Sequence, residues 1–97
     1  MSKLTIIAKI KANFSAEEKV HKELINLIDL TRAEKGCIQY TLHRSIEDNS
    51  IFLFYEIWEN KESWQKHMKS KHIIAYEKNT ETLVESWDLY QLTKQDK

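Results

Sequence analysis

Apolar and polar side chains alternate almost strictly near the start of the chain. The apolar positions are Leu4, Ile6, Ala8, Ile10 and Ala12. Lysine or threonine fills most of the positions between them, and Ile7 is the exception. A period of two is typical of a strand with one buried face, so the pattern predicts a strand over residues 3–13.

The apolar spacing then changes to that of a helix. The positions with helical spacing are Val20, Leu24, Leu27, Ile28 and Thr31, and charged residues lie between them. This predicts a helix over about residues 16–34. Ser15 and Glu18 have the spacing of a capping box, in which each side chain bonds a free backbone amide. Gly36 is placed to end the helix in the left-handed conformation, which glycine adopts without a Cβ penalty.

Two further apolar segments predict an antiparallel hairpin, with strands at 37–44 and 51–58 and a polar turn at 47–50. That turn would pair Ile46 with Ile51 and Thr41 with Glu56, although a slip of one residue would change every pair. One face would then carry Gln39, Thr41, His43, Phe54, Glu56 and Trp58. The other face would carry Ile38, Tyr40, Leu42, Leu53, Tyr55 and Ile57, with the two tyrosines serving as packing. Because both faces are rich in large side chains, we expect helices over one and the sheet of a second copy over the other.

The rest of the chain predicts a broken helix and a last strand. Asn60 is a candidate N-cap for a helix that runs to about Ser70 and buries Trp64 and Met68. A second helical segment covers about 71–82, and a strand covers 83–92. The order is the βαββαβ pattern of a ferredoxin-like α+β fold with an antiparallel sheet. We expect one domain over residues 1–97, with its core at about 3–92.

Composition narrows the possible partners and surroundings. Lys plus Arg and Asp plus Glu number 15 each, so the net charge is zero. We therefore expect neither nucleic acid nor membrane as a partner. No apolar run approaches the roughly 20 residues of a membrane span, and the first residues favour a strand over a signal peptide. With a single cysteine, Cys37, no internal disulfide is possible, and we expect a cytoplasmic protein in which Cys37 is a small apolar residue rather than a nucleophile.

One carboxylate is set among aromatic side chains, because Glu56 would share a strand face with Phe54 and Trp58. Burying a lone carboxylate costs several kcal/mol unless it is paired, hydrogen-bonded or protonated. Glu56 is therefore either a base or anchor at a pocket wall, or a structural partner of Thr41, an arginine or a lysine. Phe54, Trp58 and Trp64 either line an apolar cavity for a flat ligand or belong to the core.

The two histidines of the broken helix are the other candidate group. His67 and His72 are five residues apart, which on a continuous helix separates them by roughly 140°. They can converge only if the helix breaks near Ser70, and Tyr76 would share a face with His72. They either move a proton near neutral pH at a pocket edge or are solvated or capping residues. The spacing matches no common metal motif, so we expect no metal site.

Three segments together resemble the antibiotic biosynthesis monooxygenase domain family, and in particular its quinol-monooxygenase-like branch. They are Thr31–Tyr40 (TRAEKGCIQY), Glu56–Trp58 (EIW) and His67–His72 (HMKSKH). The resemblance covers about residues 3–92 and implies ferredoxin-like chains that pair as a dimeric α+β barrel. It also implies an oxygenase that needs no metal or flavin, in which the protein takes a proton and the substrate anion reduces O2.

Other branches of the family match less well. The polyketide-oxidising members use an Asn, a Trp and a Tyr at positions held here by Phe54, Trp58 and Trp64, so two of the three polar groups are missing. The haem-degrading members use a Trp and an axial His at positions held here by His67 and Glu77. A branch that isomerises a phosphorylated sugar would need a basic cluster near the pocket, which this sequence lacks.

The sequence therefore predicts a cofactor-independent monooxygenase that acts with O2 on a quinol or similar small aromatic molecule, as a homodimer. The predicted catalytic residues are Glu56, His67 and His72. The predicted substrate-binding residues are Phe54, Trp58, Trp64 and Tyr76. The alternative is a non-catalytic small-ligand-binding or stress-response module on the same dimeric fold.

Overall fold

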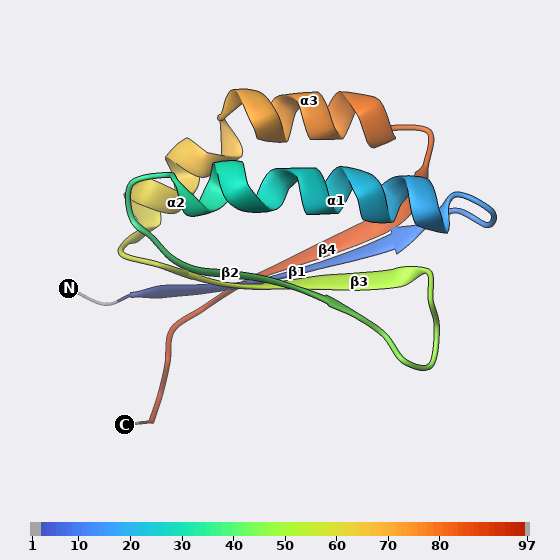
Figure 1. The fold of residues 1–97 in the computed structure, drawn as a ribbon. Helices are drawn as coiled ribbons and strands as arrows, with labels where there is room; N and C mark the ends of the chain where they lie inside the picture. Colours follow the sequence, from blue (N-terminus) through green and yellow to red (C-terminus); the bar gives the residue numbers. More distant parts are fainter. Residues whose placement is uncertain (1–2, 97) are drawn as a thin grey trace.

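The computed structural model describes residues 3–96, which form a four-stranded antiparallel sheet with three helices on one face (Figure 1). The elements are β1 (Leu4–Ala12), α1 (Glu17–Arg32), β2 (Cys37–Arg44), β3 (Ile51–Trp58), α2 (Lys61–Met68), α3 (Lys71–Thr80) and β4 (Val84–Leu92). The strand order is β2-β3-β1-β4. The predicted ferredoxin-like fold is confirmed, and the bounds of β2 and β3 are those predicted.

The core lies between the helices and the sheet, in two clusters. The larger one packs Val20, Leu24 and Leu27 of α1 against the sheet residues Ile10, Tyr40, Phe52 and Phe54. The smaller one contains Leu4, Ile6, Trp58 and Trp64. The period-two and helical patterns therefore point the expected apolar residues inward.

The start of α1 differs from the prediction. Ser15 has a φ of 72°, and the N-cap is Ala16, which offers no side-chain hydrogen bond. The turn after β1 is closed by the Ala16 amide, which donates to the Asn13 carbonyl, and it leaves Ser15 outside the cap position. The Glu18 carboxylate instead accepts a hydrogen bond from Arg44 at 2.7 Å. The predicted capping box is thus wrong, because the turn chemistry sets the entry to the helix.

Gly36 is left-handed as predicted, with a φ of 88°, but it does not cap α1. The helix ends at Arg32, and its C-cap Ala33 is right-handed. A Cβ at Gly36 would lie 2.3 Å from the Ser63 hydroxyl oxygen. The glycine therefore allows the loop before β2 to approach α2 closely.

The hairpin register differs from the prediction by one residue. Tyr40, not Thr41, lies opposite Glu56, and Thr41 lies opposite Tyr55. The Ser45 amide donates to the Ile51 carbonyl, and the Ser45 hydroxyl accepts hydrogen bonds from two amides of the turn. Ser45 therefore pairs with Ile51 in place of Ile46, which is fully exposed. This slip turns Tyr40 toward the helices and moves the face with Thr41 to the other side.

The break between α2 and α3 occurs where the sequence predicted it. The Asn60 side chain caps α2 by accepting from the Ser63 amide at 2.8 Å. Ser70 is the N-cap of α3, and its hydroxyl also donates to the His67 carbonyl at 2.7 Å. The break changes the helix direction between His67 and His72.

The outward face of the sheet has no covering element within residues 3–96 (Figure 1). Its central positions are Ile7 of β1 and Leu53, Tyr55 and Ile57 of β3. Ile38, Tyr90 and Leu92 are exposed near the edges. We call this set of seven residues the outer face.

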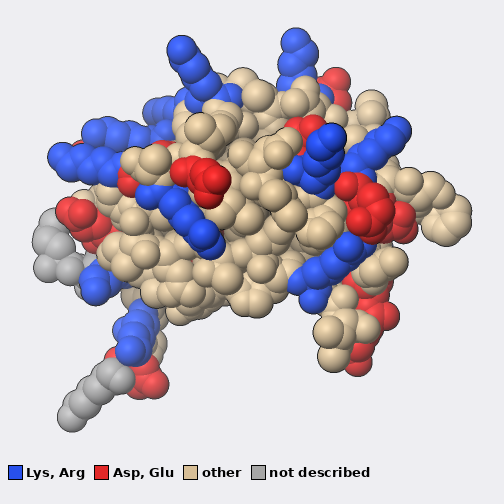
Figure 2. Space-filling view, viewed as in Figure 1, with Lys and Arg blue, Asp and Glu red and all other residues tan. Residues whose placement is uncertain are grey.

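In Figure 2, positive and negative side chains are interspersed over the side of the molecule that is shown.

No helix within the described residues is long and apolar enough to span a membrane.

Candidate functional site

A cavity of about 410 Å³ lies between the sheet and the helices α1 and α3. Its walls are mostly apolar, and this volume falls in the range of small-molecule sites. The strands contribute Ala8, Ile10, Tyr40, Phe54, Glu56, Val84, Trp87 and Leu89. The helices and the turn after α3 contribute Leu24, Leu27, His67, Met68, Ile73, Tyr76, Glu77, Thr80 and Glu81.

Glu56 is the buried carboxylate of this cavity, with only 3% of its surface exposed. The Trp58 Nε1–H donates to its Oε1 at 2.9 Å. Burial raises the pKa of Glu56 to about 7; the hydrogen bond from Trp58 opposes this shift and the negative charge of Glu34 adds to it. Its partner is therefore an indole, not Thr41, an arginine or a lysine. The carboxyl is able to take up or release a proton near neutral pH.

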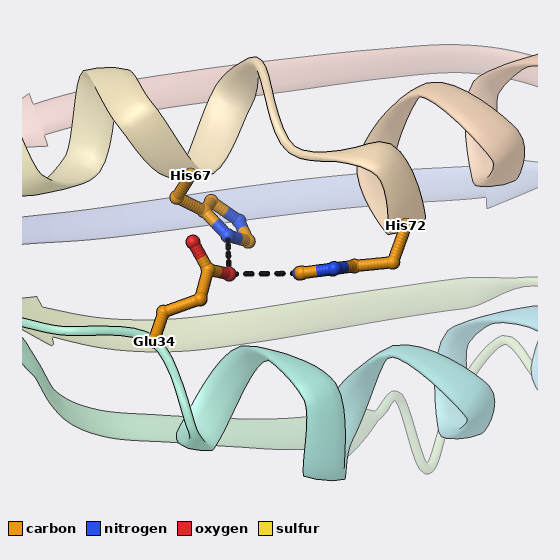
Figure 3. A group of neighbouring side chains, drawn as sticks. All are labelled: Glu34, His67 and His72. Atoms are coloured by element: carbon orange, nitrogen blue, oxygen red, sulfur yellow. Dashed lines mark hydrogen bonds and ion pairs between the residues drawn. The ribbon is translucent and has the colours of Figure 1, made fainter.

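His67 and His72 converge on one carboxylate oxygen (Figure 3). The His67 Nδ1 lies 2.6 Å and the His72 Nε2 lies 2.8 Å from Oε2 of Glu34. Glu34 comes from the loop after α1, His67 from the last turn of α2 and His72 from the first turn of α3. The convergence that required a break near Ser70 is thus present in the structure.

The loop that carries Glu34 is tied to the sheet. Arg32, the last residue of α1, donates from Nε and Nη2 to the Tyr40 carbonyl at 3.1 and 2.9 Å. The Cys37 amide donates to the Glu34 carbonyl at 3.2 Å. These bonds hold the Glu34 backbone beside the helix break.

The contact with Glu34 orients the His67 ring. An ionised carboxylate accepts from Nδ1–H, which leaves Nε2 as the acceptor nitrogen of a neutral imidazole. Burial lowers the pKa of His67, against the opposing effect of Glu34, and so favours that neutral form. The ring is 2% exposed, packs against Trp58 at 4.8 Å between centroids, and lines the cavity.

Two phenols and one thiol in or beside the site stay protonated at neutral pH. Burial, together with the charge of Glu56, raises the pKa of Tyr40 far above its usual range. Burial raises the pKa of Tyr76 to about 12. Burial and the charges of Glu34 and Glu56 raise the pKa of the Cys37 thiol to about 11, in keeping with the expectation that Cys37 is no nucleophile.

The predicted site residues divide into two groups. Phe54, Glu56, His67 and Tyr76 line the cavity. Trp58, Trp64 and His72 do not: the two indoles pack in the smaller core cluster, and His72 bonds Glu34. The alternative of plain core packing therefore describes Trp64, while Trp58 supports the site through its N–H.

The sequence reasoning missed Glu34, Tyr40 and Trp87. Glu34 and Tyr40 fall within the segment Thr31–Tyr40 that resembles the family, but no pattern marked their roles. Tyr40 was assigned to the wrong face by the register, and it stacks on Phe54 with ring centroids 4.2 Å apart. Trp87 belongs to the last strand, and no pattern there indicated a cavity.

The chain matches the model of a known protein family over most of its length. The model of the family described as antibiotic biosynthesis monooxygenase matches residues 3–79.

Individual relatives match over nearly the whole chain. The uncharacterized protein YjcS of Bacillus subtilis is 32% identical over 85 residues, which are 88% of this chain and 80% of YjcS. The crystal structure of PA3566 from Pseudomonas aeruginosa is 30% identical, with a TM-score of 0.95 over 99% of this chain and 97% of that chain. Rv0793 from Mycobacterium tuberculosis has a TM-score of 0.91 at 24% identity, over 99% of this chain and 98% of that one, which is similarity of fold alone.

Proposed function

The chain belongs to the antibiotic biosynthesis monooxygenase family, and from this premise we propose that it oxidises a quinol or a similar aromatic ring with O2 and without a cofactor. The observation that supports this proposal best is the buried carboxylate of Glu56 at the wall of an apolar cavity. Its Oε1 is fixed by Trp58, and Oε2 accepts no hydrogen bond from any residue among 3–96. A substrate hydroxyl can donate to that oxygen.

The first step is the removal of a proton from the substrate by Glu56. A phenolic hydroxyl has a pKa of about 10, as in tyrosine. Raising the pKa of the carboxylate from 4.5 to about 7 brings acceptor and donor closer together. Proton transfer is most effective when the two values are close while the base is still ionised at the working pH.

The electron-rich anion then reacts with O2. One electron passes from the quinol anion to O2, and the two radicals join at a ring carbon to give a peroxide, which takes back the proton held by Glu56. His67 removes the proton on that ring carbon and the O–O bond breaks, and the departing hydroxide takes this proton from His67 and leaves as water. In total, one quinol and one O2 give one hydroxyquinone and one water, and the quinol supplies the four electrons that reduce O2.

The remaining cavity residues hold the ring. Phe54, Trp87 and Leu89 offer apolar contact, and aromatic side chains pack well against a flat ligand. The protonated phenols of Tyr40 and Tyr76 are donors to the substrate oxygens. The apolar lining limits water around the anion, which strengthens every charge interaction within the cavity.

The test uses menadiol and O2 with protein from which metal ions have been removed by a chelator. We expect O2 consumption above the autoxidation rate and a product that carries one added oxygen atom. Glu56→Gln keeps the acceptor for Trp58 but removes the base, so the rate should fall by about 10²–10⁴-fold. Glu59→Gln makes the same change at an exposed site and should leave the rate unchanged. Formation of hydrogen peroxide and menadione alone, or full activity of Glu56→Gln, would contradict the proposal.

The alternative function, binding without turnover, is favoured by the placement of two aromatic side chains. Phe54 lines the cavity at a position where the polyketide-oxidising relatives have a polar side chain, and Trp64 lies outside the cavity. Menadione should then quench the tryptophan fluorescence, and Trp87→Phe, which removes the indole in the cavity wall, should reduce that quenching. Quenching with no O2 consumption would favour the binding module.

We also propose that the protein is a homodimer that pairs two outer faces. A monomer leaves three of these seven side chains exposed and the other four half-buried, and their burial by a second sheet would stabilise the chain.

A further inference from the structure

Glu34, His67 and His72 bring three potential ligand atoms to one point beside the cavity. We propose that they form a binding site for a divalent first-row transition metal, with Zn²⁺ as the ion of choice. The two imidazoles come from different helices and approach the same carboxylate oxygen from two sides (Figure 3).

The geometry requires only small movements. The His67 Nδ1, the His72 Nε2 and a Glu34 oxygen lie within 4.8 Å of one another. Zinc is bound by nitrogen and oxygen at about 2.0–2.2 Å, so the ligand atoms of a tetrahedral site are about 3.3 Å apart. The two nitrogens would therefore close by about 1.5 Å at most, and the oxygen would move outward by about 0.5–0.7 Å. Glu34 lies in a loop and has rotatable side-chain bonds that permit this movement.

The donor set suits the proposed ion. Two neutral imidazoles and one carboxylate are ligands of zinc and of Fe(II), Co(II) and Ni(II), whereas Mg²⁺ and Ca²⁺ prefer oxygen alone. Three protein ligands leave a coordination position for water. The side chains of Glu34 and His72 are each 17% exposed, so an ion can enter from the solvent side. The side chain of His67 is only 2% exposed and closes the inner side of the proposed metal site.

The site is also held in place before any ion arrives. Ser70 caps α3 and bonds the His67 carbonyl, so the two histidines are fixed on either side of one helix break. Arg32 ties the loop of Glu34 to β2. An ion that replaces the two N–H donors therefore meets ligands that are already close to their bound positions.

Metal binding would change the cavity as well as the cluster; this consequence rests on the proposed function. An ion on Nδ1 of His67 requires the remaining ring proton to be on Nε2, the nitrogen left for the cavity. Nε2 then donates a hydrogen bond and can no longer accept the ring-carbon proton of the substrate. We infer that zinc inhibits the proposed oxidation.

The test measures binding separately from activity. Zn²⁺ is titrated into metal-free protein by calorimetry, and Co²⁺ is used as a spectroscopic probe of the coordination. We expect one ion per chain, a ligand-field spectrum typical of low coordination number, and a rise in Tm with Zn²⁺. His72→Ala and Glu34→Gln should each weaken binding by at least about tenfold.

The matched control is His43→Ala, which removes an exposed histidine that makes no hydrogen bond among the described residues. It should bind Zn²⁺ as tightly as the wild type. No binding by the wild type, or equal binding by His72→Ala and His43→Ala, would overturn the metal site. If one ligand variant fails to fold by circular dichroism, the other decides the result. Zinc binding without catalytic activity would support the site while contradicting only the proposed oxygenase.

Discussion

The buried position of Glu56 supports its proposed role as a base but lowers the stability of the folded protein. Its burial suits it to accept a proton, but the same burial disfavours the ionised form that acts as the base. The neighbouring groups stabilise the ionised carboxylate only weakly. Trp58 donates one hydrogen bond to it, whereas Glu34 is negative and Tyr40 and Cys37 are neutral. A site that works at neutral pH is therefore expected to reduce the stability of the fold.

Stability should fall as the pH rises through the range in which Glu56 ionises. Its folded pKa of about 7 lies above the unfolded value of 4.5, so the native state binds the proton more tightly between these values. The stabilising contribution of the bound proton is fully present below the unfolded pKa and is lost as pH rises toward 7. The loss amounts to at most roughly 3 kcal/mol above pH 7.

Glu56→Gln removes this dependence. Urea unfolding should show the variant more stable than the wild type at pH 8, and close to it near pH 4.5. Glu59→Gln, at an exposed position, should show no such divergence between the two pH values. An equal effect of Glu56→Gln at both pH values would mean that the carboxyl is not ionised by this change in pH.

At the scale of elements, the site depends on where helices end. A continuous helix would point His67 and His72 in different directions, and the break at Ser70 is what brings both to Glu34. The loop before β2 must also pass close to α2, and Gly36 makes that approach possible. The short connections between elements therefore position this cluster as much as the elements do.

Gly36→Ala should be strongly destabilising for two reasons. The φ of 88° costs a non-glycine residue roughly 1–2 kcal/mol, and the new Cβ would lie 2.3 Å from the Ser63 hydroxyl oxygen. We expect a total loss of about 2–4 kcal/mol in the free energy of unfolding, measured by denaturant titration.

A double mutant separates the two causes. Ser63→Gly removes both atoms closest to the new Cβ, so the loss in Gly36→Ala/Ser63→Gly should be smaller than the sum of the single losses. The conformational cost at residue 36 should remain. Simple additivity of the two substitutions would show that the close approach to α2 is not the source of the steric cost.

At the scale of the whole molecule, the sheet is covered on only one side. Helices and cavity occupy one face, while the outer face presents large apolar side chains, among them Tyr55 at the centre of β3. A specific interface needs about 800 Å² from each partner, and the uncovered face of a four-stranded sheet is the surface on which such an area is most easily found. Pairing would also remove an exposed patch that favours aggregation.

The wild type should sediment as a dimer at micromolar concentration. Tyr55→Lys would bury a charge at the centre of the interface, so its dissociation constant should rise by at least about 100-fold. Leu30→Lys is the matched control, because it places the same side chain at an exposed position on α1. A monomeric wild type, or a Tyr55→Lys variant that remains dimeric, would contradict pairing through the outer face.

Local patterning was sufficient to predict the element order, both hairpin strands, the Asn60 cap and the helix break near Ser70. These features depend on residues close together in the chain, where side-chain period and capping chemistry act directly. The inclusion of Phe54, Glu56, His67 and Tyr76 among the candidate residues rested on the same patterns, and these four line the cavity.

The hairpin register, the entry to α1 and the partner of the histidines required the folded structure. The register shifts by one residue because Ser45 closes the turn earlier than the composition suggested, and this shift alone brings Tyr40 into the site. Glu34 meets His67 and His72 across separations of 33 and 38 residues. No period or spacing within one element indicates which distant carboxylate will lie there, because such contacts are set by how helices and sheet pack together.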